Sequence, residues 1–275
     1  YEGDDLVFVW PLMRARRLGF SVLTWLSDPF GQYGDVLCSK GQNAKQWISS
    51  SITFLNRLKD VDILRLRHVR EDSHLFGCAN LLVNARVPDK APFLDFTQFA
   101  DEAAYDARYT STQRKRRKKI RKSIEDLGAV SFTQLPVGIV ADAAIKQAIF
   151  EKNAWLEERG RINRVLGCPG HLDFLKSLSR RMSGNVDVVV TELKAGERPV
   201  SWEVGFRHNG IHYGYITSHV NALTDLSPGR LHMDLSQRAC LNDGMKSFDL
   251  MVPNDAHKES WSSATVNTED YFLPL

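Results

Sequence analysis

The sequence predicts an α/β (α+β) fold in which a mixed central sheet is flanked by helices. We expect two compact units, at residues 1–95 and 96–275. Three observations support this prediction. The 275 residues are 43% hydrophobic and 25% charged, an ordinary globular composition with enough apolar mass for two cores. Helix-like and strand-like periods occur in both parts. Near residue 186 the period changes from helical to that of consecutive strands.

The first part is predicted as an antiparallel strand pair, a helix and a further strand. The pattern "DLVFVWPLMRAR" (5–16) is strand-like, and a turn near Arg17–Gly19 leads into its partner. Residues 43–60 place apolar side chains near a 3.6-residue period, which predicts a helix, and 62–69 alternates like a strand. The chain opens at Tyr1 in a turn that runs directly into a strand pattern, so we expect this unit to be incomplete at its N-terminus.

The second part is predicted to begin with helices. In "RKRRKKIRKSIEDLG" (114–128), Ile120, Ile124 and Leu127 form an apolar stripe, and Gly128 stands where a C-cap belongs. A short strand follows, and then two further helices at about 139–159 and 171–182.

Three consecutive strand patterns then predict an antiparallel meander, with strands at 186–193, 199–207 and 211–218. Asn209–Gly210 predicts a tight hairpin between the last two strands, because both turn positions require positive φ.

A helix and a strand follow the meander. Ser227 is a good N-cap, Pro228 a good first helical residue, and Gly244 ends the helix. This spacing predicts a crossover that places 211–218 and 246–252 side by side and parallel.

Positive charge is concentrated in one short segment. Eight of the nine residues 114–122 are Lys or Arg, whereas the rest of the chain has 28 basic against 33 acidic residues. This distribution argues against a general nucleic-acid binder. No aromatic residue lies between Gln113 and Val130 to stack on bases. We therefore expect no specific nucleic-acid partner, although a nucleic-acid-binding module stays a rival interpretation.

The four cysteines are far apart and form no CxxC pair, which predicts buried thiols in a reducing cytoplasm. No apolar run approaches the ~18 residues that span a bilayer, and no signal peptide is visible. The histidines show no metal-binding spacing, so we expect no metal. A covalent hydrolase is not indicated, because GxSxG is absent. The oligomeric state is not indicated by the sequence.

The segment "SPGR" opens the last predicted helix. A helix N-terminus exposes backbone N–H groups and partial positive charge. Gly229 allows close approach of a phosphate, and Arg230 could add a charge-assisted contact. The alternative is an ordinary N-cap, Ser227, followed by proline.

The basic run, the meander, "LSPGRLHMDLSQRACLNDGMKSFDLM" and "HKESW" occur in an order that resembles GNAT-type acyltransferase domains. More narrowly, the chain resembles the CelD-type group associated with cellulose and exopolysaccharide biosynthesis, which is related to the FemAB-like transferases with two GNAT units in tandem. The resemblance covers residues 100–262 well and 5–95 more weakly.

This resemblance implies an acyltransferase with acyl-CoA, of the acetyl-CoA type, as co-substrate. The donor would lie against the helix at Pro228, with Ser227, Gly229, Arg230 and Leu231 as its contacts. The acceptor would be an amine or hydroxyl of a sugar, glycan precursor or related small molecule. The usual phosphate-binding loop is Gly-rich and basic, and "SPGR" departs from it. Two alternatives therefore stay open, an aminoacyl-tRNA donor as in FemAB-like relatives and a non-catalytic scaffold.

Two carboxylates are candidate bases. Asp35 in "QYGDVL" lies beside Tyr33, and FemAB-like proteins place such a loop near the acceptor, which implies catalytic and substrate-binding roles for these two residues. Asp35 could equally be a turn former. Glu203 lies within a strand on the face opposite Trp202 and Val204, where some GNAT enzymes have a basic carboxylate. The alternative is an outward, solvated glutamate.

Further candidates follow in the second part. Tyr215 could donate to a leaving thiolate, or be a core residue. His257 is a candidate acid or base, or a polar loop residue. Lys258 and Trp261 match residues common in the family at this point, which implies contact with a phosphate or sugar-nucleotide of the acceptor.

Arg117 and its neighbours Arg116 and Lys118 are candidates for steering an anionic substrate or a CoA phosphate toward the site. They also fit peripheral association with an anionic membrane surface. The alternative is a solvated helix face.

Overall fold

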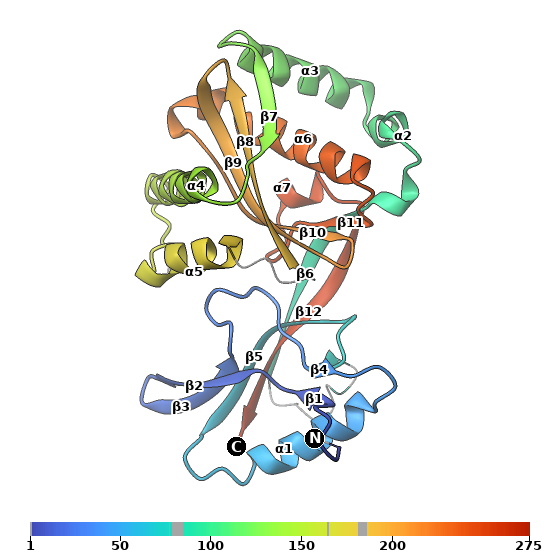
Figure 1. Ribbon diagram of the computed structural model, residues 1–275, viewed down its shortest axis with the longest axis vertical. Coiled ribbons are helices and arrows are strands. Elements are labelled where there is room, and N and C mark those ends of the chain that lie inside the picture. Colours follow the sequence, from blue (N-terminus) through green and yellow to red (C-terminus); the bar gives the residue numbers. More distant parts are fainter. Residues whose placement is uncertain (1, 77, 79–84, 164, 181–185) are drawn as a thin grey trace. The chain divides into compact units, whose positions relative to one another are not determined.

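The protein is described here by a computed structural model that covers residues 2–76, 78, 85–163, 165–180 and 186–275 (Figure 1). It contains two compact units, one formed by Tyr1–Pro92 with Val252–Leu275 and the other by Phe93–Met251. The predicted boundary after residue 95 lies near this division. However, residues 252–275 pack with the first unit, because their strand pairs there.

The first unit has strands in the order β2-β3-β5-β12 and a separate small β1-β4 pair. β3 is parallel to β5, and β5 is antiparallel to β12. The elements are β1 (Phe8–Val9), β2 (Leu12–Arg17), β3 (Phe20–Trp25), β4 (Leu37–Cys38), α1 (Ala44–Leu55), β5 (Ile63–Arg70), α7 (Ala256–Glu259) and β12 (Ala264–Pro274).

Helix α1 stabilises this sheet. Its side chains Ile48, Ile52 and Leu55 are buried in one apolar cluster with residues of β3 and β5. Asn43 caps it by accepting a hydrogen bond from the N–H of Gln46. The predicted strand pair, helix and strand are confirmed, although the helix ends at Leu55, before the predicted end. β12 was not predicted.

The second unit has strands in the order β6-β11-β10-β9-β8-β7. Of β6, only the last residues, Phe93–Asp95, belong to this unit, and they pair with β11. The meander β7-β8-β9-β10 is antiparallel, and β10 is parallel to β11. The elements are β6 (Ala85–Asp95), η2 (Phe96–Gln98), α2 (Glu102–Ala107), α3 (Ser111–Glu125), β7 (Val130–Gln134), α4 (Ile139–Glu157), α5 (Pro169–Arg180), β8 (Val186–Ala195), β9 (Arg198–His208), β10 (Ile211–His219), η3 (Asn221–Leu226), α6 (Pro228–Asn242) and β11 (Ser247–Asp249).

Helices cover both faces of this second sheet (Figure 1). Helices α4 and α5 pack on one face, around Ile145, Leu175 and Val204. Helices α3 and α6 pack on the other, where Ile124 and Leu231 join one apolar cluster. The predicted α/β class, with a mixed sheet flanked by helices, is confirmed.

The basic run forms α3, as predicted. Thr110 and Gln113 make a reciprocal capping box at its start. Ile124 is buried, but Leu127 is 44% exposed and lies beyond the helix, which ends at Glu125. The apolar stripe is therefore shorter than predicted. Across the described part of the chain, no helix combines the length and apolar character needed to cross a membrane.

Candidate active site

The crossover β10–α6–β11 builds the candidate site. The parallel ladder joins Ile211–Tyr213 to Ser247–Asp249, and β10 runs on to His219. Asn209 and Gly210 form the predicted hairpin turn, with φ of 50° and 80°. Helix α6 begins beyond the carboxyl end of β10. In open α/β sheets this end of a parallel strand, together with a helix N-terminus, is where anionic ligands bind.

The first turn of α6 has no side-chain cap. Ser227 is the N-cap, as predicted, but it has φ 57° and its side chain forms no capping hydrogen bond. Pro228 is the first helical residue and has no N–H, and Gly229 adds no side chain. Leu231 is buried in one apolar cluster with Ile124, so it holds the first turn of α6 against the core.

Two arginines bring positive charge to this turn. Burial lowers the pKa of Arg230, and the charges of Arg116 and Arg117 lower it further. Arg117 bonds to Asp234 on α6 and stacks over Tyr109, with its guanidinium carbon 3.5 Å from the ring centre. Arg117 is thus held against the protein. Arg116 and Arg230 form no ion pair with any described residue, and they are the cations available to an anion.

His219 lies beside the same turn. A Cβ at Gly229 would be 3.4 Å from its Nδ1, and its Nε2 is 3.2 Å from the hydroxyl of Thr224. Burial lowers the pKa of His219, and the charges of Lys152 and Arg159 lower it further, so the ring is neutral at pH 7. Sequence reasoning missed this residue, although its position at the end of a strand before "SPG" was visible.

Tyr215 occupies a β-bulge. The pairing of β10 with β9 shifts between Gly214 and Ile216, which makes Tyr215 the extra residue. Its hydroxyl is 2.9 Å from Nε2 of the buried His171 on α5. Burial raises the pKa of Tyr215 to about 12 and lowers that of His171. Tyr215 therefore keeps its proton at neutral pH. Because a thiol has a pKa of about 8.5, Tyr215 suits hydrogen-bond donation to a thiolate rather than full proton transfer.

Glu203 lies inside the core. It is 1% exposed, and its Oε1 is 2.7 Å from Nε2 of His212, which is also buried. Gly205 makes room for the imidazole, since a Cβ there would be 2.7 Å from His212 Nε2. The alternative of an outward, solvated Glu203 is therefore wrong, because its carboxylate belongs to a buried ion pair beneath α6, and its role as a base stays a prediction.

The pKa values of the pair favour the charged forms. Burial alone raises the pKa of Glu203, but the hydrogen bond and charge of His212 lower it overall. Burial alone lowers the pKa of His212, but interactions with Cys240 and Glu203 raise it to about 9. Nearby, His232 bonds to Thr191 at 2.8 Å, and burial lowers its pKa to about 4. The pair is therefore ionised beside a neutral histidine.

This pair predicts a loss of stability at alkaline pH. A raised histidine pKa stabilises the fold fully below the unfolded value of about 6.5, and this contribution disappears as pH rises through about 9. We expect the free energy of unfolding to fall by about 3 kcal/mol over this window. Urea unfolding at several pH values measures it. The double variant Glu203→Met/His212→Leu retains the cysteines and should lack this component; an equal alkaline loss in both proteins would contradict the assignment.

Asp35 and Tyr33 belong to the first unit. Both Asp35 carboxylate oxygens accept backbone hydrogen bonds, from the N–H groups of His74 at 2.9 Å and Leu75 at 3.1 Å. The guanidinium of Arg70 lies over the Tyr33 ring at 4.8 Å. Asp35 thus joins its loop to a second segment, which limits its availability as a base.

His257, Lys258 and Trp261 also belong to the first unit. His257 and Lys258 lie in the short helix α7, where the Lys258 N–H donates to Asp255 at 2.8 Å. His257 is exposed, whereas Trp261 is 2% exposed. The structure therefore groups Ser227, Gly229, Arg230 and Arg117 at one turn of the second unit. The roles of the five first-unit residues stay predictions.

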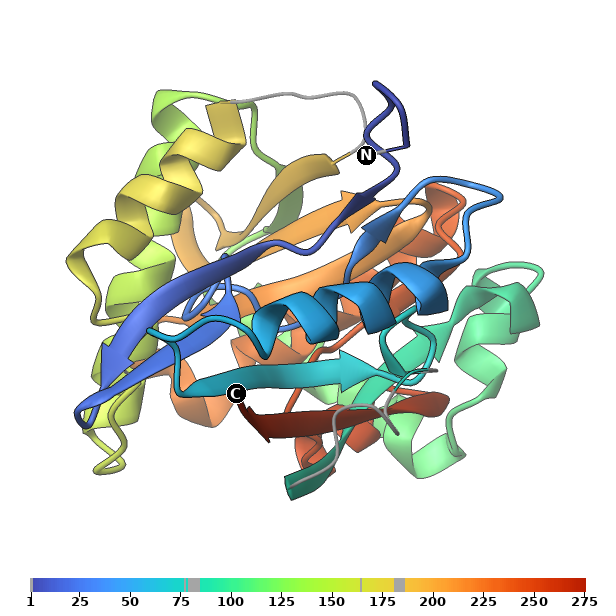
Figure 2. The same ribbon diagram turned by 90° about the horizontal axis from the view of Figure 1, so that it is seen from below.

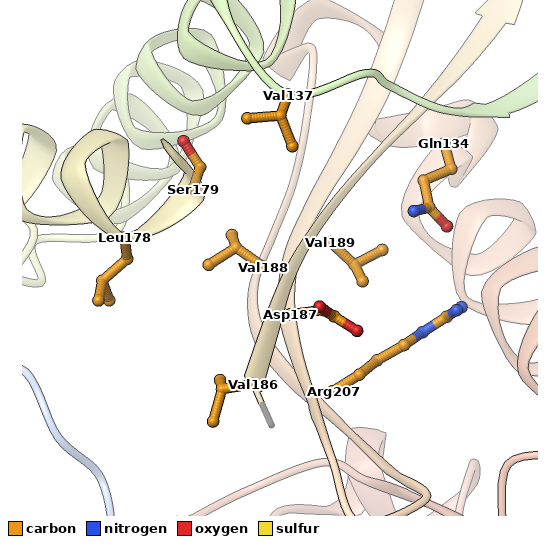
Figure 3. A pocket seen from close by; sticks show the side chains of 9 residues that line it. All are labelled: Gln134, Val137, Leu178, Ser179, Val186, Asp187, Val188, Val189 and Arg207. Carbon is orange, nitrogen blue, oxygen red and sulfur yellow. The ribbon is translucent and has the colours of Figure 1, made fainter. Parts of the chain in front are cut away.

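A shallow hollow of about 260 Å³ lies elsewhere in the second unit (Figure 3). Leu178 comes from α5, Val188 from β8 and Val137 from the segment before α4, and Asp187 and Arg207 are cross-strand neighbours on β8 and β9. No predicted site residue lines it. Among the described residues, no group of three or more His, Cys, Asp or Glu side chains is arranged to hold a metal ion.

Comparison with known proteins agrees with this architecture. The Acetyltransferase (GNAT) domain family matches residues 114–259. No curated protein sequence matches the chain. Among solved structures, L-PGS from Bacillus licheniformis has a TM-score of 0.60 at 12% identity, covering 96% of this chain and 82% of that one. FemX has a TM-score of 0.55 at 11% identity, covering 96% and 88%. A tandem GNAT protein from the clavulanic acid biosynthesis pathway has a TM-score of 0.53 at 9% identity, covering 100% and 81%.

These structural likenesses concern the fold, and two GNAT-like units in tandem are consistent with them. Both units also share a strand–helix–strand crossover between parallel strands, β3–α1–β5 in the first and β10–α6–β11 in the second. The family match spans more than half of the chain, from the basic helix to α7. The protein therefore belongs to the Acetyltransferase (GNAT) domain family and is an enzyme of the transferase kind.

Proposed function

We propose that this protein transfers an acyl group from acyl-CoA, of the acetyl-CoA type, to an amine or hydroxyl of a sugar, glycan precursor or related small acceptor. The observation that supports this proposal is the first turn of α6. It combines a helix N-terminus, the missing side chain of Gly229 and the cations Arg230 and Arg116. The acceptor class rests on the CelD-type resemblance.

In the proposed reaction, the acceptor nitrogen or oxygen attacks the thioester carbonyl carbon. The new C–N or C–O bond forms, the C–S bond breaks, the acceptor loses a proton and the CoA thiolate takes one up. The α6 turn binds the donor phosphates, and Tyr215 donates a hydrogen bond to the departing sulfur. Asp35, Glu203 and His257 remain the predicted bases, with Tyr33, Lys258 and Trp261 predicted at the acceptor.

Gly229→Glu tests the donor site. A carboxylate at this second helical position favours the helix dipole and replaces a helical glycine, so folding should be preserved. It would repel the donor phosphates, and we expect CoA to bind about 100-fold more weakly. Val140→Glu is the matched control, because Val140 is the second residue of α4 and is 54% exposed. Calorimetric titration of each variant with CoA measures the difference.

The same titrations distinguish the alternatives. Equal CoA affinity in Gly229→Glu and the wild type would contradict the proposed donor site. Wild-type protein that binds aminoacyl-tRNA but not CoA would favour the FemAB-like donor. Protein that binds neither would favour a non-catalytic scaffold.

A further inference from the structure

The β2–β3 hairpin ends in a turn whose sequence does not suit its backbone (Figures 1 and 2). Leu18 and Gly19 have φ of 52° and 87°, both positive as in a type I′ turn. This turn favours Asn, Asp or Gly at its first position, whereas a leucine in the left-handed region is strained. Another hairpin of this chain follows the rule, with Asn209–Gly210 at 50° and 80°.

The same leucine is completely exposed. Leu18 is 100% exposed, and Phe20 next to the turn is 53% exposed. Leu18 thus neither suits the turn nor packs in the core, so its contribution to folding does not explain its presence. A strained backbone position of this kind points toward a function.

Basic side chains surround this tip. Arg16 is exposed and forms no ion pair with a described residue. Arg17 lies opposite Phe20 in the ladder and bonds to Asp28 at 2.5 Å. Three carboxylates bond to this hairpin: Asp28 binds Arg17, Asp60 binds Arg14, and Asp62 accepts the N–H of Ser21 at 2.7 Å. The tip therefore exposes the apolar side chains of Leu18 and Phe20, with the cation of Arg16, unpaired among the described residues, beside them.

A lipid bilayer fits this tip better than a protein does. A stable protein interface buries roughly 800 Å² on each partner, which two protruding apolar side chains do not supply. A membrane surface accepts single apolar side chains, and the arginines can keep their guanidinium groups among the headgroups. Arg16 complements anionic lipids.

We infer that the β2–β3 hairpin tip, with Leu18 and Phe20 as its apolar side chains and Arg16 as its cation, docks on an anionic lipid bilayer. This site belongs to the first unit and does not depend on the proposed acyl transfer or on the basic helix α3.

Leu18→Asn tests the inference, because asparagine suits the turn better than leucine does. Vesicle flotation would use an equimolar mixture of phosphatidylglycerol and phosphatidylcholine. We expect wild-type protein to float with these vesicles, and Leu18→Asn to partition about tenfold more weakly with an unchanged or higher midpoint of thermal unfolding. Arg16→Gln should weaken partitioning about fivefold, and vesicles of phosphatidylcholine alone should bind less.

The matched control is Ile139→Asn, which removes an aliphatic side chain that is 87% exposed at the start of α4; it should bind vesicles like the wild type. Wild-type protein that does not float, or Leu18→Asn that floats equally well, would overturn the inference. So would an Ile139→Asn protein that loses as much binding as Leu18→Asn. Light scattering tests for self-association. If the wild type self-associates, does not bind vesicles, and Leu18→Asn abolishes the self-association, the tip would instead be an interface with a second copy of this chain.

Discussion

Replacing His212 with leucine is expected to lower the free energy of unfolding by about 3–5 kcal/mol. The imidazole and the carboxylate of Glu203 are 2% and 1% exposed. Without His212, a buried carboxylate loses its partner and must either stay charged in the core or take up a proton. Chemical unfolding at neutral pH, monitored by fluorescence and circular dichroism, measures the change.

The double variant Glu203→Met/His212→Leu separates loss of the pair from loss of packing. Replacing both ions with apolar groups of similar volume is often neutral or stabilising, so we expect most of the lost stability to return. Two observations would contradict a structural ion pair. One is a His212→Leu protein as stable as the wild type. The other is a double variant no more stable than His212→Leu.

Replacing Trp261 with alanine is expected to cost about 3–5 kcal/mol. Trp261 is 2% exposed and ranks among the largest fully buried side chains of the described residues. The segment "HKESW" suggested a substrate contact for this tryptophan. Its burial indicates that its main contribution is to the packing of the core. His257→Ala is the control from the same segment, because His257 is exposed, and it should change stability by less than about 0.5 kcal/mol.

Trp261→Phe tests the remaining substrate role. Phenylalanine keeps much of the buried surface, so the fold should survive and kinetics can be measured. An unchanged KM for the acceptor would fit a packing role. A raised KM in a variant of nearly wild-type stability would support the predicted acceptor contact. A Trp261→Ala protein that unfolds like the wild type would show that packing here contributes little.

Features that depend on neighbours in sequence were predicted well. Asn209–Gly210 identified a hairpin, because few residue pairs adopt two consecutive positive φ values. "SPG" located the start of α6, because proline suits the first helical position. Thr110 and Gln113 cap α3 reciprocally, but the prediction covered only the apolar stripe and misjudged Leu127, whose position depends on where the helix stops.

Features that depend on the tertiary fold were missed. His171 and Tyr215 are 44 positions apart, and only the packing of α5 on the meander brings them together. The contact of His212 with Glu203 requires both the hairpin register and the space above Gly205. The sequence pattern identified Glu203 as a polar residue within a strand. It did not show that other elements bury the face of the sheet on which Glu203 lies. For this reason the candidate bases were the least predictable part of the site.

The division of the chain also has a consequence for its biosynthesis. β5 pairs with β12, and Leu64 and Leu66 on β5 are 1% and 0% exposed in the finished fold. The ribosome releases β5 long before β12, with all of residues 93–251 made in between. During that interval one edge of β5 has no partner, and open strand edges invite aggregation. Of the two units, the one whose strands β2, β3 and β5 are translated earlier is therefore completed later, and chaperone dependence should be greatest while the second unit is still emerging.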